Sequence, residues 1–467
     1  MTAIDFTTEV EKRKEDLLAD LFSLLEINSE RDDSKVDAEH PFGPGPVKAL
    51  EKFLEIAARD GYPTKNVDNY AGHFEFGDGE EVLGIFAHMD VVPAGSGWDT
   101  DPYTPTIKDG RLYARGASDD KGPTTACYYG LKIIKELGLP ISKKVRFIVG
   151  TDEESGWADM DYYFEHVGLA KPDFGFSPDA EFPIINGEKG NITEYLHFAG
   201  ENAGAARLHS FTGGLRENMV PESATAVVSG DLVADLQGKL DAFVAEHKLR
   251  GELQEEAGQY KVTIIGKSAH GAMPASGVNG ATYLALFLSQ FDFAGPAKDY
   301  LDIAGKILLN DHEGENLKIA HVDEKMGALS MNAGVFRFDE TSADNTIALN
   351  IRYPKGTSPE QIKSILENLP VASVSLSEHG HTPHYVPMED PLVQTLLNVY
   401  EKQTGLKGHE QVIGGGTFGR LLERGVAYGA MFPDSIDTMH QANEFIALDD
   451  LFRAAAIYAE AIYELIK

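Results

Sequence analysis

Clusters of histidine and carboxylate side chains recur along this chain, each after an apolar run or just before an expected helix. Carboxylates and imidazoles are strong ligands of divalent cations in proteins. The chain has a single cysteine, Cys127, so a zinc site built from several cysteines is excluded. Cys127 itself is expected to be a small core residue of a helix. The residue types therefore favour a metal site built from histidine and carboxylate alone. The clusters are His88 with Asp90, Asp119 with Asp120, Glu153 with Glu154, Asp179 with Glu181, and His440.

The number of these side chains suits a pair of metal ions. Two metals about 3.5–4 Å apart need one bridging carboxylate and terminal ligands for each ion, and three carboxylates with two histidines meet that count. A further carboxylate beside the metals would act as a general base. The adjacent residues Glu153 and Glu154 offer both roles, because neighbouring side chains in an extended segment point in opposite directions.

Taken singly, each cluster also has a plainer interpretation. A histidine after a strand is more often structural or solvated than a ligand. Adjacent acids such as Asp119 and Asp120 commonly cap helices. Glu153 and Glu154 could begin a helix, where the dipole favours negative charge. The metal hypothesis depends on all the clusters occurring together, most of them at successive strand ends.

The elements that would position these clusters alternate between strand and helix up to about residue 188. Apolar runs predict strands at 82–86, 143–149 and 173–176, and a helix is expected at 122–137. Strands separated by helices imply a mostly parallel sheet with right-handed crossovers. Ligands in such sheets bind outside the carboxyl ends of the strands, and the clusters fall at such ends.

The pattern changes near residues 187–190. Beyond them polarity alternates at period two, as in 260–264 and 348–352, which predicts strands with one buried face. Helices are expected between these strands, so the region predicts a second, α+β domain with an antiparallel sheet. The expected helices are 231–246, 279–290 and 359–369, and the chain becomes helical again at 391–403 and from Leu448 onward.

Composition excludes several classes of partner. The chain has 467 residues, which predicts two to three domains, and a formal net charge of -33. Nucleic acid and anionic membrane surfaces need a basic footprint, so we expect neither as a partner. No run approaches ~18 consecutive apolar residues, and the first helix is amphipathic, so neither a membrane span nor a signal peptide is expected. A single cysteine suits a reducing compartment and predicts a cytoplasmic protein.

The motifs also resemble a known family. The runs 88–93, 115–122 and 152–154 look like the co-catalytic di-zinc exopeptidases that include aminoacylase and succinyl-diaminopimelate desuccinylase. The runs 173–181 and 414–420 match as well. Within this family of metallopeptidases the similarity to the carnosinase-like dipeptidases, which cleave Xaa-His, extends along nearly the whole chain.

The resemblance implies two Zn²⁺ per chain, with Mn²⁺ or Co²⁺ as substitutes. His88 and Asp179 would hold one ion, and Glu154 and His440 the other. An aspartate would bridge them. Spacing alone does not choose between Asp119 and its neighbour; the Arg-Gly-x-x-Asp pattern selects Asp119.

The same resemblance implies roles for two carboxylates that hold no metal. Asp90 would orient the His88 imidazole. Glu153 would take a proton from the water that bridges the metals and deliver it to the leaving amine, while the zinc pair lowers the pKa of that water and polarises the scissile carbonyl.

The second domain would be the family's lid. His270 matches the lid histidine that stabilises the tetrahedral oxyanion. Asn218 and Arg352 match residues that hold the substrate's C-terminal carboxylate, which a guanidinium pairs bidentately. Gly415 lies in a glycine run that lacks the phosphate-loop pattern, so close approach of backbone to a peptide substrate is the better interpretation.

The implied fold is an α/β catalytic domain of the zinc-exopeptidase type, with a mostly parallel sheet flanked by helices, and an inserted lid. The catalytic domain is discontinuous, at 1–188 and 386–467, and the lid spans 189–385. That insertion is long enough for two ferredoxin-like halves. In the family's dimers a single lid unit pairs with its copy, so a doubled lid predicts a monomer.

The leading hypothesis is a di-zinc dipeptidase that hydrolyses unblocked dipeptides of broad side-chain range, including Xaa-His and carnosine-like substrates. Its partner is a small peptide substrate. The alternative on the same metal chemistry is an N-acyl-amino-acid deacylase or desuccinylase. A non-catalytic metal- or peptide-binding protein is a third hypothesis, and the complete set of ligands together with Glu153 argues against it.

Overall fold

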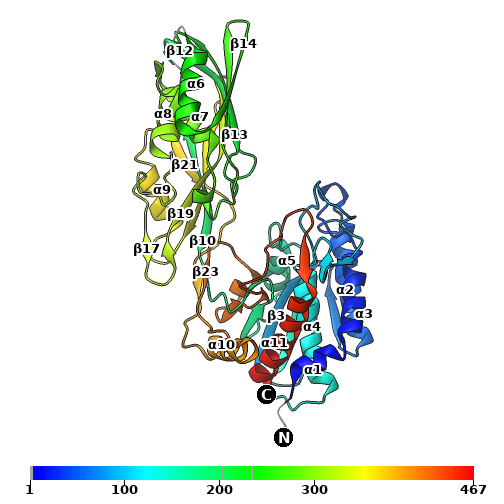
Figure 1. Ribbon diagram of the computed structural model, residues 1–467. Helices are drawn as coiled ribbons and strands as arrows, with labels where there is room; N and C mark the ends of the chain where they lie inside the picture. The colour runs from blue at the N-terminus through cyan, green and yellow to red at the C-terminus, as the bar shows by residue number, and fades with distance from the viewer. Residues whose placement is uncertain (1–3, 202, 233–234) are drawn as a thin grey trace. The chain divides into compact units, whose positions relative to one another are not determined.

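The computed structural model describes residues 4–201, 203–232 and 235–467, and these divide into two compact units (Figure 1). The first unit comprises the chain up to Gly187, with Tyr385–Gln411 and Gly416–Lys467. The second comprises Glu188–His384 and Val412–Gly415. Short strands lie where the chain passes between the units: β9 (Gly187–Glu188), β22 (His384–Tyr385) and β23 (Val412–Ile413).

A six-stranded sheet forms the centre of the first unit. Its three pairings from β6 to β24 are parallel, and the two pairings at the β1 edge are antiparallel. The parallel strands are mostly apolar, as expected for strands buried on both faces. In order across the sheet the strands are β1 (Thr64–Val67), β2 (Ala71–Phe76), β6 (Lys144–Gly150), β3 (Val82–His88), β7 (Phe174–Ser177) and β24 (Gly425–Ala427).

Side chains of alternating direction on β3 serve two different cores. Leu83 and Ile85 belong to the large core shared with the helices, and Phe86 belongs to a smaller core on the opposite face. Helices α4 and α11 lie side by side in the helical layer (Figure 1). The helices of this unit are α1 (Phe6–Glu11), α2 (Lys14–Leu25), α3 (Pro44–Arg59), α4 (Lys121–Glu136), α5 (Ala158–Asp161), α10 (Pro391–Thr404) and α11 (Leu448–Ile466).

Two small sheets accompany the central one. They matter because they lie next to segments that carry the clusters found in the sequence. One joins β4 (Thr106–Lys108), β5 (Arg111–Tyr113) and β26 (Phe445–Ala447), and the other joins β8 (Ala180–Glu181) and β25 (Ala430–Met431).

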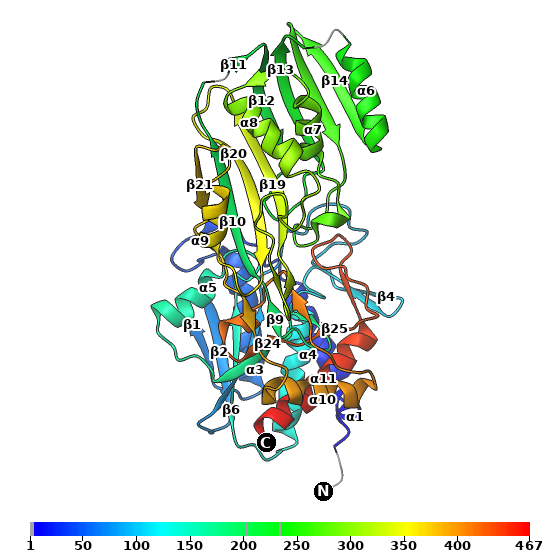
Figure 2. The same ribbon diagram turned by 90° about the vertical axis from the view of Figure 1, so that its left-hand side faces the viewer.

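The second unit is built on one eight-stranded sheet in which every pairing is antiparallel. Figure 2 shows its long strands β10, β19 and β20 running side by side. In order the strands are β14 (Arg250–Glu256), β15 (Gln259–Ile265), β13 (Ser223–Gly230), β12 (Ala206–Gly213), β19 (Ser330–Asp339), β20 (Asn345–Tyr353), β10 (Gly190–Phe198) and β21 (Ser373–Leu376).

One face of this sheet is apolar and carries the helices. Along β10, Ile192 and Leu196 enter the core, whereas Tyr195 and His197 lie on the more polar face. This alternation is typical of an antiparallel sheet covered on one side. The helices are α6 (Leu236–His247), α7 (Gly280–Leu288), α8 (Pro296–Asp302) and α9 (Pro359–Leu366), and two short pairs complete the unit, β11 (Ala203–Gly204) with β16 (Phe293–Ala294) and β17 (Val322–Asp323) with β18 (Gly327–Ala328).

The structure refines several expectations. The first sheet is mixed, because its β1 edge is antiparallel. Residues 412–415, predicted to lie in the catalytic domain, group with the second unit. The helix expected at 231–246 begins at Leu236, and its residues 233–234 lie outside the described part of the chain. Within the described ranges, no helix has the length and apolarity needed to cross a membrane.

Candidate active site

The parallel strands of the first unit deliver several of the predicted residues to one edge of the sheet. His88 is the last residue of β3, Glu153 and Glu154 follow β6, and Asp179 follows β7. Because β3, β6 and β7 run parallel, their carboxyl ends meet at the same edge. Asp119 comes from the segment just before α4.

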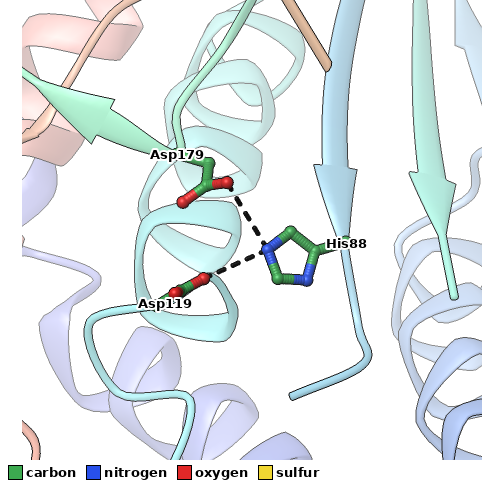
Figure 3. A group of neighbouring side chains, drawn as sticks. All are labelled: His88, Asp119 and Asp179. Carbon is green, nitrogen blue, oxygen red and sulfur yellow. Dashed lines mark hydrogen bonds and ion pairs between the residues drawn. The ribbon is translucent and has the colours of Figure 1, made fainter. Parts of the chain in front are cut away.

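His88, Asp119 and Asp179 form one group of facing ligand atoms (Figure 3). The His88 Nε2 atom lies 3.1 Å from Asp119 Oδ1 and 3.5 Å from Asp179 Oδ2. The His88 side chain is 1% exposed, so the imidazole is held away from bulk water. The arrangement presents one imidazole nitrogen and two carboxylates to a common point.

A second group shares Asp119 with the first. The other Asp119 oxygen, Oδ2, lies 2.9 Å from His440 Nε2, and the same nitrogen lies 3.2 Å from Glu154 Oε1. Each oxygen of one carboxylate thus faces a different imidazole. A carboxylate placed in this way would be able to contact two metal ions at once.

The electrostatics of the two groups reflect crowded carboxylates. Burial opposes protonation of His88, but hydrogen bonds to carboxylates, Asp119 first, outweigh it and raise the pKa well above its usual value. Burial also opposes charge on His440, yet Asp119 and Glu154 raise its pKa to about 11. Burial and the charge of Asp119 raise the pKa of Glu154 to about 8. Two imidazoles and three carboxylates lie close together here, and both are ligand types that divalent cations prefer.

Asp90 joins the strand that carries His88 to the loop that carries the two glutamates. The His88 Nδ1 atom lies 3.0 Å from the backbone carbonyl of Asp90 and 3.4 Å from its Oδ1. The Asp90 carboxylate accepts the backbone N–H groups of Glu153 at 3.2 Å and Glu154 at 3.0 Å. Donation from Nδ1 leaves Nε2 free of its proton in the neutral ring, as a metal ligand requires.

Glu153 lies beside the two groups without belonging to either. Its pKa is raised well above the usual value, first by burial and then by the charges of Asp179, Glu154 and Asp119, against the effect of His88. A carboxylate that holds a proton more tightly than usual suits a general base that must later return that proton.

The structure separates Asp119 from its neighbour Asp120. Asp120 Oδ2 accepts the backbone N–H of His88 at 3.3 Å and the hydroxyl of Thr124 at 2.8 Å. Asp120 is fully buried and belongs to neither ligand group among the described residues. The geometry therefore favours Asp119 as the bridging residue.

The residues predicted to contact substrate all lie in the second unit. The Gly271 N–H, next to His270, donates to the carbonyl of Asn218 at 2.7 Å. The Nδ1 atom of His270 accepts the N–H of Ala272 at 3.1 Å, which leaves its other ring nitrogen as the donor. Asn218 and His270 are both exposed.

Arg352 lies near the same loops. Its Nη1 donates to the carbonyl of Gly414 at 2.9 Å, and its Nε donates to Asn350 Oδ1 at 3.2 Å. A side chain at Gly414 would come within 3.3 Å of Ala272, so the glycine run approaches the His270 loop closely. Asn218, His270, Arg352 and the run that contains Gly415 therefore gather in one part of this unit.

Comparison with known proteins gives the family. The model of Peptidase family M20/M25/M40 matches residues 84–464. The chain belongs to this family of peptidases. The resemblance seen in the sequence motifs is thereby confirmed, and the family implies divalent metal ions.

Relatives of this M20 peptidase match along its whole length. Beta-Ala-Xaa dipeptidase of Lactobacillus delbrueckii subsp. lactis is 44% identical over 468 residues, which cover 99% of this chain and 99% of that protein. Human carnosine dipeptidase 1 superposes with a TM-score of 0.59 at 16% identity and 98% coverage of both chains. The M20 family metallo-carboxypeptidase Sso-CP2 of Sulfolobus solfataricus gives 0.57 at 19%, covering 96% of this chain and 98% of its own. At these identities the two structures show the fold alone.

The sequence did not reveal the carboxylates of this M20 peptidase that accept backbone N–H groups of the loops bearing the candidate ligands. Asp159 Oδ2 accepts the N–H groups of Thr151 at 2.7 Å and Asp152 at 3.0 Å. Glu444 does the same for the segment before α4. The signal that could have found Glu444 is Arg115, since a buried arginine requires a counter-ion.

Proposed function

We propose that this chain is a dipeptidase that uses two metal ions, normally zinc, to hydrolyse unblocked dipeptides of broad side-chain range. The observation that carries the proposal is the pair of ligand groups that share Asp119, with Glu153 beside them. The name of a relative 44% identical over nearly the full length supports the substrate class. β-Alanyl dipeptides and Xaa-His dipeptides such as carnosine belong to the proposed range.

The two groups support a proposed assignment of the ligands. His88 and Asp179 would hold one ion, Glu154 and His440 the other, and Asp119 would contact both. When bound, the ions supply Lewis-acid chemistry to the scissile carbonyl and to the attacking water.

The general base in this proposal is Glu153. Its carboxylate would take the proton of the attacking water and pass it to the leaving amine, which needs a group that is basic before the attack and acidic after it. The N–H hydrogen bonds to Asp90 hold the backbone of Glu153 and Glu154 together, so base and ligand keep a fixed spacing.

Residues of the second unit would bind the substrate, in the manner of the carnosinase-like dipeptidases that the sequence resembles. Arg352 and Asn218 would hold the C-terminal carboxylate. His270 would donate to the developing oxyanion, consistent with acceptance at its Nδ1 by the Ala272 N–H. The backbone of Gly415 would approach the peptide.

The test is hydrolysis by the protein stripped with chelator, then restored with measured equivalents of Zn²⁺, Mn²⁺ or Co²⁺. We expect activity on free dipeptides, lost on chelation and maximal at two equivalents. N-acyl amino acids form the comparison panel, because they carry the carboxylate and the amide but no free amino group. Preference for that panel would establish the deacylase alternative, which the comparisons do not favour. Full activity in the chelated protein would refute the metal proposal.

A further inference from the structure

Glu444 is a buried carboxylate that holds the segment leading to Asp119. Its Oε1 accepts the backbone N–H groups of Ser118 at 2.8 Å and Asp119 at 3.2 Å. Its Oε2 accepts the N–H of Gly116 at 3.2 Å and the Arg115 Nη1 at 2.5 Å. Four donors from a single segment thus converge on one side chain, which is fully buried.

Glu444 and His440 lie on the same loop, and the ends of that loop are fixed. The N–H of Phe445, the residue after Glu444, donates to the Thr438 hydroxyl at 3.1 Å. The Glu444 carbonyl accepts the N–H of Ala114 at 3.2 Å. The loop that bears His440 is therefore joined to the segment that bears Asp119 through both backbone and side chain.

The partner of Glu444 extends this connection to a third segment. Arg115 is 1% exposed, and its Nη2 donates to the carbonyl of Pro93 at 3.3 Å, in the chain that follows His88 and Asp90. The Trp98 ring lies 5.3 Å from the guanidinium carbon. The Arg115–Glu444 pair thus touches three of the segments that carry candidate metal ligands.

We propose that Glu444 is a positioning residue that sets the affinity of both metal positions by fixing Asp119 relative to His440. The inference rests on the proposed function, since it concerns the same ligands. Asp119 would serve both ions, so any displacement of its backbone would weaken both positions together. A group that orients ligands without touching metal typically changes metal affinity by about 10- to 100-fold.

A carboxylate suits this position because all four of the hydrogen-bond partners described above are donors. Replacement by glutamine keeps the shape and turns one acceptor oxygen into an NH₂ group, which would then face an N–H of the 116–119 segment or the Arg115 guanidinium. The segment has to move to relieve that contact. Because Asp119 belongs to the segment, its two oxygens move with it.

The experiment compares Glu444→Gln with Asp390→Asn in the full-length chain. Asp390 pairs bidentately with Arg424 in the same unit, at 2.8 Å for both contacts, and neither residue belongs to a ligand group. Each stripped protein is titrated with Zn²⁺ against a competing chelator. Each is also loaded with Co²⁺, whose visible spectrum reports coordination geometry independently of turnover.

We expect Glu444→Gln to bind both equivalents of Zn²⁺ about 10- to 100-fold more weakly and to change the Co²⁺ spectrum. We expect Asp390→Asn to lower the unfolding temperature but leave affinity and spectrum unchanged. Wild-type affinity and spectrum in a destabilised Glu444→Gln would overturn the inference, because a merely structural role moves stability alone.

A second variant, which retains the carboxylate, keeps the inference testable in case Glu444→Gln does not fold. Glu444→Asp retains the ion pair but is one methylene shorter, so it reaches fewer of the N–H groups, and we expect the same change at smaller size. Unchanged affinity in this variant would also count against the inference. Failure of the wild-type chain to bind two equivalents would instead refute the proposed function, so the two failures are distinguishable.

Discussion

At the scale of single residues, Asp119 organises the site. Its two oxygens face His88 and His440 separately, at 3.1 Å and 2.9 Å. The carboxylate next to it in the sequence, Asp120, is used instead to hold the backbone of His88. Two adjacent aspartates therefore have different functions, because their backbone directs one toward the ligand groups and the other toward α4.

The role of Glu153 gives the most direct prediction. Glu153→Gln removes the proton acceptor but no proposed ligand, so we expect turnover to fall by about 10²–10⁴-fold while two equivalents of metal remain bound. The measurement is kcat for a simple dipeptide together with the metal content of the dialysed protein. Glu154→Gln is the matched control, since it removes a proposed ligand and should reduce metal content as well. Near-normal turnover in Glu153→Gln would contradict the assignment.

At the scale of elements, the edge formed by the parallel strands explains why distant residues meet. β3, β6 and β7 end at the same side of the sheet, and each is followed at once by a candidate ligand or base. The helical layer behind them holds that sheet in place. The most extensive contact between helices in this layer joins α11 to α4, which starts just after Asp119.

The contact between these two helices depends on Gly130. A Cβ atom at this position would lie 2.8 Å from the backbone nitrogen of Ala459 and 3.0 Å from the carbonyl carbon of Tyr458. We therefore expect Gly130→Ala to destabilise the first unit by about 2 kcal/mol, although alanine is the better helix former. Gly156→Ala is the control, because its Cβ would meet only Asp152 Oδ2, at an ordinary 3.5 Å. Chemical unfolding of both variants measures the difference, and equal stability would contradict the packing argument.

In the second unit, Glu194 is a fully buried acid within the strand β10. Among the described residues neither of its carboxylate oxygens has a hydrogen-bond partner. Burial raises its pKa to about 8; Lys363 opposes this shift, and Glu360 and Glu367 add to it. The side chain therefore enters the folded core as a neutral acid at pH 7.

A pKa raised by folding makes stability depend on pH. The folded chain keeps a proton that the unfolded chain loses near pH 4.5, so the free energy of unfolding should fall as pH rises from 4.5 to about 8. The cost at pH 7 is about 3 kcal/mol. Glu194→Gln should raise the free energy of unfolding by up to that amount at pH 7 and leave it unchanged near pH 4. The dependence of stability on pH should therefore become flatter in this variant. Hydrogen exchange of the β10 amides across this pH range measures the free energy of unfolding. The control is Glu252→Gln, at an exposed position, which should keep the wild-type dependence of stability on pH.

At the scale of the whole molecule, the chain divides its predicted tasks between two units. The described candidate ligands and Glu153 lie in the first, and the candidate substrate residues lie in the second. The second unit is a continuous eight-stranded sheet, long enough to contain the two halves predicted from the sequence. Its ferredoxin-like description and its role as a lid stay predictions.

The two lid halves predicted from the sequence lead in turn to the prediction of a monomer. A second lid half would take the place that a partner subunit fills in dimeric relatives, so light scattering should give a mass near the 50.9 kDa of one chain. The measurement is made on the metal-loaded protein across a range of concentrations. A mass twice as large at all concentrations would contradict the prediction.

Residue types and local order were determined by the sequence alone. Apolar runs predicted the parallel strands and the helices of the first unit, and with them the clusters at strand ends. The motifs around His88, Asp119 and Glu153 predicted the family. These are local signals, since a buried strand and the residue after it are adjacent in the chain.

Only the tertiary structure decided which oxygen faces which imidazole. It placed one oxygen of Asp119 against each histidine, joined Asp90 to the Glu153 loop, and revealed that Glu444 accepts the N–H of Asp119. Spacing cannot supply this, because Glu444 and Asp119 are 325 residues apart and meet only when β26 pairs with β5. A hydrogen bond depends on ångström distances and on direction, and folding sets both.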